Sequence, residues 1–299
     1  MALIAIEEHW NLPELTSAVK ALPEDRGDPS VVFDELDGNL ERLHDIGDAR
    51  IAAMDAQGVD LQILSLAPPG TQPLEPADAR TLSRRANDIA AEAVGRYPAR
   101  LRAFATLPMA DPEAAAAELG RAAGLGFVGA MVYGRTAGTP LDDSRYDDLF
   151  AAAAALRQPI FLHPQIPSRT VRDAVYSGFD PMTDLALATF GWGWHVEAAV
   201  AALRLIVRGT FDRHPDLQLV LGHWGERWTS RSSSSSSRPT KTAASSPQAT
   251  PAPFSGSTSH HGRNSNDSSR KWLTHPRGRS RRRRHRWRRL ADGSARRTA

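Results

Sequence analysis

Glutamate and histidine side chains follow directly after three apolar segments, and this arrangement is typical of a metal site. The first segment, IAIEEHW, contains Glu7, Glu8 and His9 at its end. His163 closes the apolar segment PIFLH, and His223 follows LVLG with glycines on both sides. If the three segments are strands, their ends bring together a carboxylate and imidazoles, a ligand set that suits Zn, Mn or Fe.

Each of these residues alone also has an ordinary structural explanation. Their occurrence together is stronger support for a metal site than any one of them. Glu7 and His9 are two apart, so on a strand they point the same way, although a surface glutamate and a capping histidine would look alike. His163 alone could be a satisfied core histidine. The glycines beside His223 allow close backbone approach, and Glu226 is placed to hydrogen-bond its ring and fix the tautomer. Three strand ends with such groups favour a metal centre.

Weaker candidates lie elsewhere in the chain. His195 in GWGWHVEAA is expected to cap or pack a helix, with a substrate-lining role as the alternative. The pair Trp192 and Trp194 could form the floor of a pocket or pack against the sheet. Arg50 could bind an anionic substrate, although a surface role is the expected one.

The segments that must position these residues alternate between strand and helix character. Gly58 follows IAAMDAQ as a helix-terminating glycine, and Asp111-Pro112-Glu113 is typical of a helix start. Such alternation, with nearly continuous apolar strands, predicts a parallel sheet covered by helices. The predicted strands lie at Leu3–Ile6, Leu61–Leu66, Leu101–Leu107, Val128–Val132, Pro159–Leu162 and Leu217–Leu221. The predicted helices lie at Ala49–Gln57, Thr81–Arg96, Pro112–Ala123, Tyr146–Leu156 and Val196–Phe211.

A doubly wound sheet and a (β/α)8 barrel both fit this pattern. No GxGxxG or GxxxxGK[ST] follows a strand, so the signatures of nucleotide-binding sheets are missing. Polar residues at the ends of several different strands are typical of barrels. We therefore expect an α/β fold of the TIM type, a (β/α)8 barrel that is incomplete, with about six β/α units.

The composition changes abruptly near residue 227. Residues 1–226 carry 19 basic and 32 acidic residues (19 − 32 = −13), whereas residues 227–299 carry 18 and 2 (18 − 2 = +16), which together give the net charge of +3. The chain has no cysteine, which excludes thiolate ligands and disulfides. No run approaches the roughly 20 apolar residues that span a bilayer, and no signal peptide is evident. The default expectation is a soluble, cytoplasmic protein with no membrane partner.

Two domains of unlike character follow from this change. Residues 1–227 are expected to form the barrel domain, without its C-terminal strands. Residues 228–299 are a low-complexity tail rich in Ser, Pro and Arg, including RGRSRRRRHRWRRL. Such a segment cannot bury enough apolar surface to offset its chain entropy, so we expect it to be disordered.

Several motifs together resemble the amidohydrolase-related decarboxylase family, which includes aminocarboxymuconate-semialdehyde, γ-resorcylate and 2,3-dihydroxybenzoate decarboxylases. They are AIEEHW, MDAQGVDLQILSLAPPG, FATLPMADPE, GAMVYGRT, LDDSRYDDLF, FLHPQ and the long segment from GWGWHVEAA to LGHWGE. The resemblance implies a (β/α)8 barrel with one divalent metal ion, Zn or Mn, and a small aromatic or unsaturated carboxylate as substrate. It implies Glu7, His9 and His163 as metal ligands, and His223 as a catalytic residue supported by Glu226. Intact relatives often form homo-oligomers.

The resemblance also implies a residue that the chain lacks. The family places an aspartate after its eighth strand, in a Ser-x-Asp-x-Pro context, as fourth ligand and proton donor. Beyond Glu226 the chain has only Asp267 and Asp292, neither after an apolar strand. We expect a frameshift near codons 226–229, and a chain that is poorly soluble and inactive as a decarboxylase.

Two alternatives stay open at this point. The same barrel could hydrolyse a lactone or an amide with metal-bound water. The chain could instead be non-enzymatic, with an authentic arginine-rich tail that binds RNA or DNA, although nucleic acid is not the expected partner.

Overall fold

The computed structural model describes residues 2–23 and 26–223. Each of the six predicted strands is present in this part of the chain, and a short hairpin, β6–β7, is added. The strands are β1 (Ile4–Trp10), β2 (Leu61–Leu66), β3 (Leu101–Ala103), β4 (Ala105–Thr106), β5 (Ala130–Tyr133), β6 (Arg135–Thr136), β7 (Thr139–Pro140), β8 (Ile160–His163) and β9 (Leu219–Leu221).

All strands outside the hairpin are parallel and neighbour one another in chain order. β1 pairs with β2 and β2 with β3; β4 pairs with β5, β5 with β8, and β8 with β9. β3 and β4 are two parts of one extended segment: the Phe104 N–H donates to the Leu64 carbonyl, and the Ala105 N–H to the Gly129 carbonyl. The segment therefore links the two groups of strands. Within the described residues, β1 and β9 each pair on one side only.

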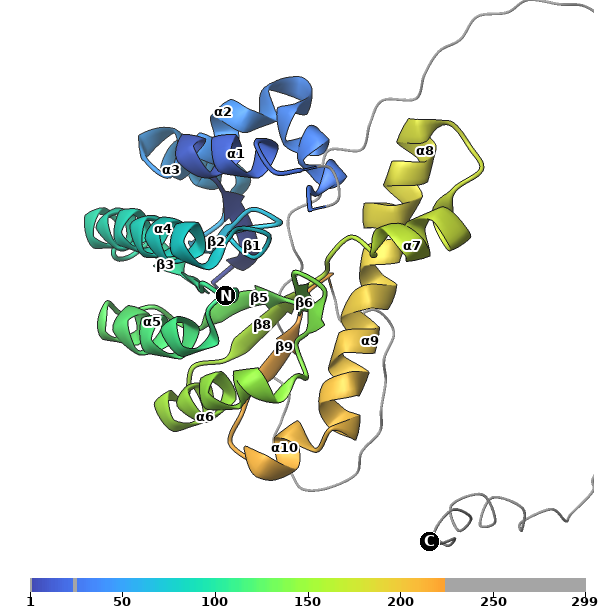
Figure 1. Cartoon of the computed structure of the whole chain (residues 1–299). Coiled ribbons are helices and arrows are strands. Elements are labelled where there is room, and N and C mark those ends of the chain that lie inside the picture. The colour runs from blue at the N-terminus through green and yellow to red at the C-terminus, as the bar shows by residue number, and fades with distance from the viewer. Residues whose placement is uncertain (1, 24–25, 224–299) are drawn as a thin grey trace, which may run out of the picture. The chain divides into compact units, whose positions relative to one another are not determined.

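Helices connect the strands, as parallel pairing requires. Figure 1 shows α3, α4, α5 and α6 in series along one side of the strands. Gly58 ends α3 in the left-handed conformation, with φ 69°, and the Asp111 side chain accepts a hydrogen bond from the Ala114 N–H at the start of α5, as the sequence predicts. The α-helices are α1 (Pro13–Lys20), α2 (Asn39–His44), α3 (Asp48–Gln57), α4 (Pro76–Arg96), α5 (Pro112–Gly124), α6 (Asp147–Leu156), α7 (Arg169–Val171), α8 (Pro181–Ala186), α9 (Gly193–Val207) and α10 (Thr210–Arg213). The 3₁₀ and π segments are η1 (Pro29–Gly38), η2 (Ser144–Tyr146), η3 (Arg172–Tyr176) and η4 (Leu187–Gly191).

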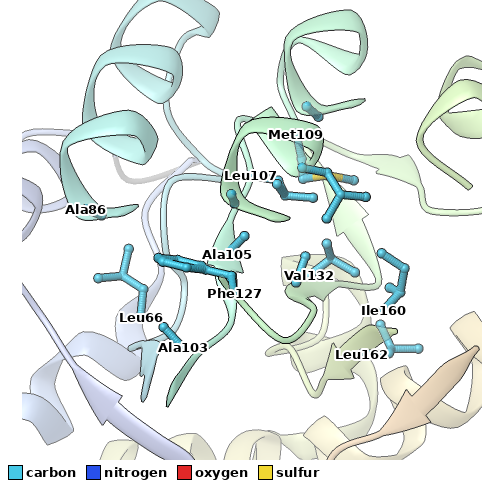
Figure 2. Packing of buried hydrophobic residues seen from close by; sticks show 14 of the residues in the cluster. Leu66, Ala86, Ala103, Ala105, Leu107, Met109, Phe127, Val132, Ile160 and Leu162 are labelled. Atoms are coloured by element: carbon cyan, nitrogen blue, oxygen red, sulfur yellow. The ribbon is translucent and has the colours of Figure 1, made fainter. Parts of the chain in front are cut away.

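Both faces of the sheet are buried, which explains why its strands are continuously apolar. On β5, Val132 belongs to the main core between strands and helices, and its neighbours Met131 and Tyr133 to a smaller cluster with Phe104 and Phe161. Figure 2 shows the main core from close by, with side chains of neighbouring strands packed together. Alternate residues of each strand thus face two different apolar layers.

The β9 end of the sheet leaves apolar surface open in the described part of the chain. A cavity of about 580 Å³ lies between α9 and β9 and is lined mainly by aliphatic side chains. Val220 on β9 is 38% exposed and Ile206 on α9 is 52% exposed. This surface lies beside β9, which pairs with β8 alone in the described residues.

Several sequence-based expectations fall outside the described residues. They concern Glu226, Asp267, Asp292 and the tail at residues 228–299. Among the helices that the structure describes, none is both long enough and apolar enough to cross a membrane.

Candidate metal centre

Three of the predicted site residues converge at the carboxyl ends of the parallel strands. Glu7 lies in β1, His163 is the last residue of β8, and His223 follows β9. Each offers one ligand atom, and these atoms all lie within 4.8 Å of one another. His9 is outside this set of three, but its ring centroid is 5.1 Å from that of His163. Residues up to 216 positions apart in the chain therefore form one cluster.

A bulge in β1 turns Glu7 toward this cluster. Ala5 pairs with Gln62 and Glu8 pairs with Leu64, so three steps along β1 oppose two along β2. Glu7, inside this bulge, has φ 63°. Strict alternation of side chains, which the sequence analysis assumed, does not hold across a bulge.

The carboxylate of Glu7 reaches the backbone after β9. Its Oε1 accepts a hydrogen bond from the His223 N–H at 3.3 Å. A Cβ on Gly222 would lie 2.6 Å from the same oxygen and 3.0 Å from the Phe161 ring. Glycine is therefore required beside His223 for steric reasons, as the sequence analysis expected for a close backbone approach.

The ring of His163 is oriented with one nitrogen left for a ligand. The side chain is fully buried. Its Nδ1 lies 2.6 Å from the Pro164 carbonyl oxygen and donates to it, whereas its Nε2 is buried with no hydrogen-bond partner. An imidazole whose one nitrogen is tied to a carbonyl while the other points into a cluster of acceptors is typical of a metal ligand.

Burial sets the charge state of the cluster. It raises the pKa of Glu7 to about 7, although the hydrogen bond from the His223 backbone opposes this. It lowers the pKa of His9 and of His223 to about 4, and that of His163 well below its usual range. The imidazoles are therefore neutral at pH 7 and have lone pairs to donate, as metal binding needs. A carboxylate among neutral imidazoles, one with an unpartnered buried nitrogen, fits a divalent cation.

Two residues orient the histidine of β1. The His9 Nδ1 lies 3.1 Å from the Ser65 hydroxyl, which leaves its other nitrogen for the cluster. Arg50 is partly buried and donates to the carbonyls of His9 and Asp45, at 2.8 Å each. The expected surface role of Arg50 is therefore wrong, and its contacts make it a positioning residue for the end of β1.

Aromatic residues form a wall beside the cluster. The Trp194 ring centroid is 6.1 Å from that of His163 and 5.9 Å from that of His223, and the Trp194 Nε1 is buried with no hydrogen-bond partner. His195 is 5.5 Å from His223, ring to ring, so its substrate-lining alternative stays open. Tyr133, 5.5 Å from His163, was missed by the sequence analysis. Its position at the end of β5 was the signal that could have identified it.

Comparisons with known proteins find similar sequences over most of the chain. The family model described as Amidohydrolase matches residues 6–255. A gamma-resorcylate decarboxylase of Rhodococcus jostii (strain RHA1) is 41% identical over 235 residues, which cover 75% of this chain and 67% of that protein.

Solved structures of other proteins are also similar to most of this chain. The 2,6-dihydroxybenzoate decarboxylase from Rhizobium superimposes with a TM-score of 0.63 at 38% identity, over 76% of this chain and 68% of that one. A 2,6-dihydroxybenzoate decarboxylase complexed with 2,6-dihydroxybenzoate gives a TM-score of 0.63 at 37% identity, over the same shares of the two chains. A dihydroxybenzoic acid decarboxylase from Polaromonas sp. JS666, with bound manganese and the inhibitor 2-nitroresorcinol, gives a TM-score of 0.62 at 37% identity, over 75% and 66%. The chain thus spans about two thirds of the length of these relatives.

Proposed function

The chain belongs to the amidohydrolase family, and on that premise we propose that its described residues form the metal-binding part of a hydroxybenzoate decarboxylase. The observation that supports this most strongly is the buried, unpartnered Nε2 of His163, close to Glu7 and His223. The relatives named above are decarboxylases of dihydroxybenzoates, and one of them holds manganese.

Glu7, His9 and His163 are the proposed ligands of one divalent ion, and we favour manganese over zinc because a solved relative contains it. When bound, the ion would supply Lewis-acid activation and a template for the carboxylate. His9 and His163 are held by Ser65 and by the Pro164 carbonyl. Their lone pairs are therefore oriented before the ion binds.

The proposed role of His223 is to handle protons near the substrate. Loss of carbon dioxide from an aromatic ring requires a proton at the carbon that carries the carboxylate. Burial keeps the pKa of His223 at about 4, so at pH 7 the ring is neutral and can donate its N–H to polarise a phenol oxygen. Trp194 can donate its free Nε1–H to an oxygen of a bound acid. Glu226, proposed to support His223, lies outside the described residues.

We further propose that this chain turns over slowly or not at all. The resemblance implies a proton-donating aspartate that the sequence does not provide, and residues 228–299 are proposed to be a frameshifted tail. Loss of a general acid typically costs a factor of about 10²–10⁴. The barrel would then lack the strands that close it, and we propose that intact relatives, not this chain, form the oligomers.

The test is to load the purified chain with Mn²⁺ and to follow 2,6-dihydroxybenzoate, with carbon dioxide and resorcinol as readouts. The Rhizobium enzyme is assayed in parallel, and a panel of lactones and amides is included. We expect manganese to bind and decarboxylation to be at least a hundredfold slower than that of the relative. Hydrolysis without carbon dioxide release would assign the barrel to a hydrolase instead, and turnover equal to the relative would disprove the incomplete site.

Sequencing the coding DNA across codons 220–235 tests the proposed frameshift. We expect another reading frame to encode an apolar strand that ends in Ser-x-Asp-x-Pro. If it does, the repaired protein should decarboxylate at the rate of its relatives. If no frame encodes such a strand, the tail is authentic and the frameshift proposal is wrong.

A further inference from the structure

A second cavity, of about 440 Å³, lies at the carboxyl ends of the strands. Its walls come from the segments after β2, β5 and β8, together with Arg26–Asp28 after α1. Gln165 in its wall is two residues beyond His163, and Arg135 is two residues beyond Tyr133. Residues of the cavity wall therefore follow closely after His163, which belongs to the candidate metal centre, and after Tyr133, which lies beside it.

The lining of this cavity is strongly basic. Four arginines line it: Arg26, Arg135, Arg169 and Arg172. Among the described residues that line it, Asp28 is the one carboxylic acid. A concave surface with an excess of guanidinium groups concentrates anions.

Two of the arginines are held in place by partners. Arg135 donates to Glu197 at 2.7 Å and to the Ile166 carbonyl. Arg26 forms an ion pair with Glu75 and donates to the Pro73 carbonyl at 2.6 Å. These contacts fix the shape of the wall and reduce the charge that the two side chains offer to a ligand.

Arg172 differs from these two. Its Nε is buried and has no hydrogen-bond partner. The nearby acid Asp28 uses its Oδ1 to accept from the Ser30 N–H and hydroxyl, at 2.9 and 2.6 Å. Burial raises the pKa of Asp28, although Arg172 and Arg135 oppose this electrostatically. A buried N–H of a charged guanidinium calls for an acceptor, and the electrostatic attraction of Asp28 does not supply a hydrogen bond to the Arg172 Nε.

We propose that this cavity binds the carboxylate of an aromatic acid through Arg172, as an outer site on the way to the metal centre. Guanidinium groups match the planar carboxylate in geometry and charge. The volume is within the range of small-molecule pockets, about 300–1,000 Å³. Only the identity of the acid rests on the proposed function; binding of the anion needs neither the metal nor turnover.

The experiment uses the full chain stripped of metal with EDTA and then dialysed, so that coordination of the acid by a metal ion cannot contribute. Isothermal titration calorimetry measures binding of 2,6-dihydroxybenzoate, resorcinol and inorganic phosphate to the wild type and to Arg172→Gln. Arg84→Gln is the matched control, since Arg84 is exposed on α4 and away from the cavity lining. Arg172→Lys keeps the charge and checks that a loss is not caused by misfolding. All variants carry the same basic tail, so its binding of anions is common to them.

We expect Arg172→Gln to weaken binding of 2,6-dihydroxybenzoate at least fivefold, Arg172→Lys to weaken it less, and Arg84→Gln to leave it unchanged. Resorcinol, which has no carboxylate, should show no dependence on Arg172. Equal affinity in the wild type and Arg172→Gln would overturn the site. If phosphate shows the same dependence on Arg172, the site takes any small anion and its assignment to an aromatic acid is wrong. Failure of the decarboxylation assay alone would leave these results unaffected.

Discussion

Replacing Gly222 with alanine tests the close approach of β1 to the segment after β9. The new methyl carbon would lie 2.6 Å from the Glu7 Oε1, 3.0 Å from Phe161 and 3.1 Å from Pro164. Phe161 lies in β8 and Pro164 directly follows this strand. Neither residue can therefore move away from the new methyl group without disturbing the sheet. The carboxylate is therefore the group that must give way.

The size of the displacement follows from the contact distance. Ordinary contact begins at 3.4 Å, so the oxygen of Glu7 must move by about 0.8 Å (3.4 − 2.6). Ligand geometry tolerates only about 0.5 Å before a site loses function. Changes of this kind around a metal site lower affinity by roughly 10–100-fold. Overpacking also destabilises by about 1–3 kcal/mol.

The assay is a competition titration of Mn²⁺ against a chelating dye, together with urea unfolding of the metal-free chain. Gly120→Ala is the control, because nothing lies within 4 Å of a Cβ on Gly120 in helix α5. It should leave manganese affinity unchanged and stabilise the chain by about 0.5–1 kcal/mol. Unchanged manganese affinity in Gly222→Ala would show that Glu7 is not a ligand in this geometry.

Three further changes test other parts of the structure. Burial raises the pKa of Glu7 from 4.5 to about 7 with its side chain 14% exposed, so Glu7 lowers the stability of the metal-free chain as the pH rises from about 4.5 to 7. The buried histidines of the cluster, whose pKa values are lowered, act in the opposite direction. Glu7→Gln should remove the Glu7 contribution, which is at most about 3.4 kcal/mol (2.5 pKa units at 1.36 kcal/mol each); a difference in unfolding free energy between the two chains that is the same at pH 5 and at pH 8 in urea titrations would contradict it. Arg50→Met leaves the His9 carbonyl without its donor and should lower the free energy of unfolding by about 1–3 kcal/mol, whereas an unchanged urea midpoint would refute the positioning role. Val220→Lys with Ile206→Glu places charge on the open β9 surface and should raise the soluble fraction on expression, while a soluble wild type would remove the basis for this prediction.

The strands and the residues after them could be predicted because their burial is recorded in the sequence. Parallel strands buried on both faces read as apolar runs, and β8 (Ile160–His163) was predicted in this way as Pro159–Leu162, with His163 directly after it. The predicted helix ends at Gly58 and Asp111 are confirmed. Gly58 adopts the left-handed backbone conformation that ends α3, and the Asp111 side chain accepts a hydrogen bond from a backbone N–H at the start of α5. Local chemistry of this kind depends on few neighbours, so the sequence alone defines it.

The bulge in β1 could not be predicted, because an extra residue shows only against the partner strand. The irregular stretch from α7 to η4 was missed for a related reason: its short α and π segments carry no sustained period. The buried, unpartnered Nε of Arg172 depends on the packing of loops after several strands. These features arise from tertiary contacts that residue spacing does not encode.

The most direct test of the metal centre is a Mn²⁺ titration of the full chain followed by electron paramagnetic resonance, with His163→Ala beside the wild type. His44→Ala is the control, because His44 lies in α2 and is not part of the cluster. We predict one tightly bound Mn²⁺ in the wild type and in His44→Ala, and its loss in His163→Ala. Binding that is the same in all three chains would place the metal elsewhere and contradict the proposed site.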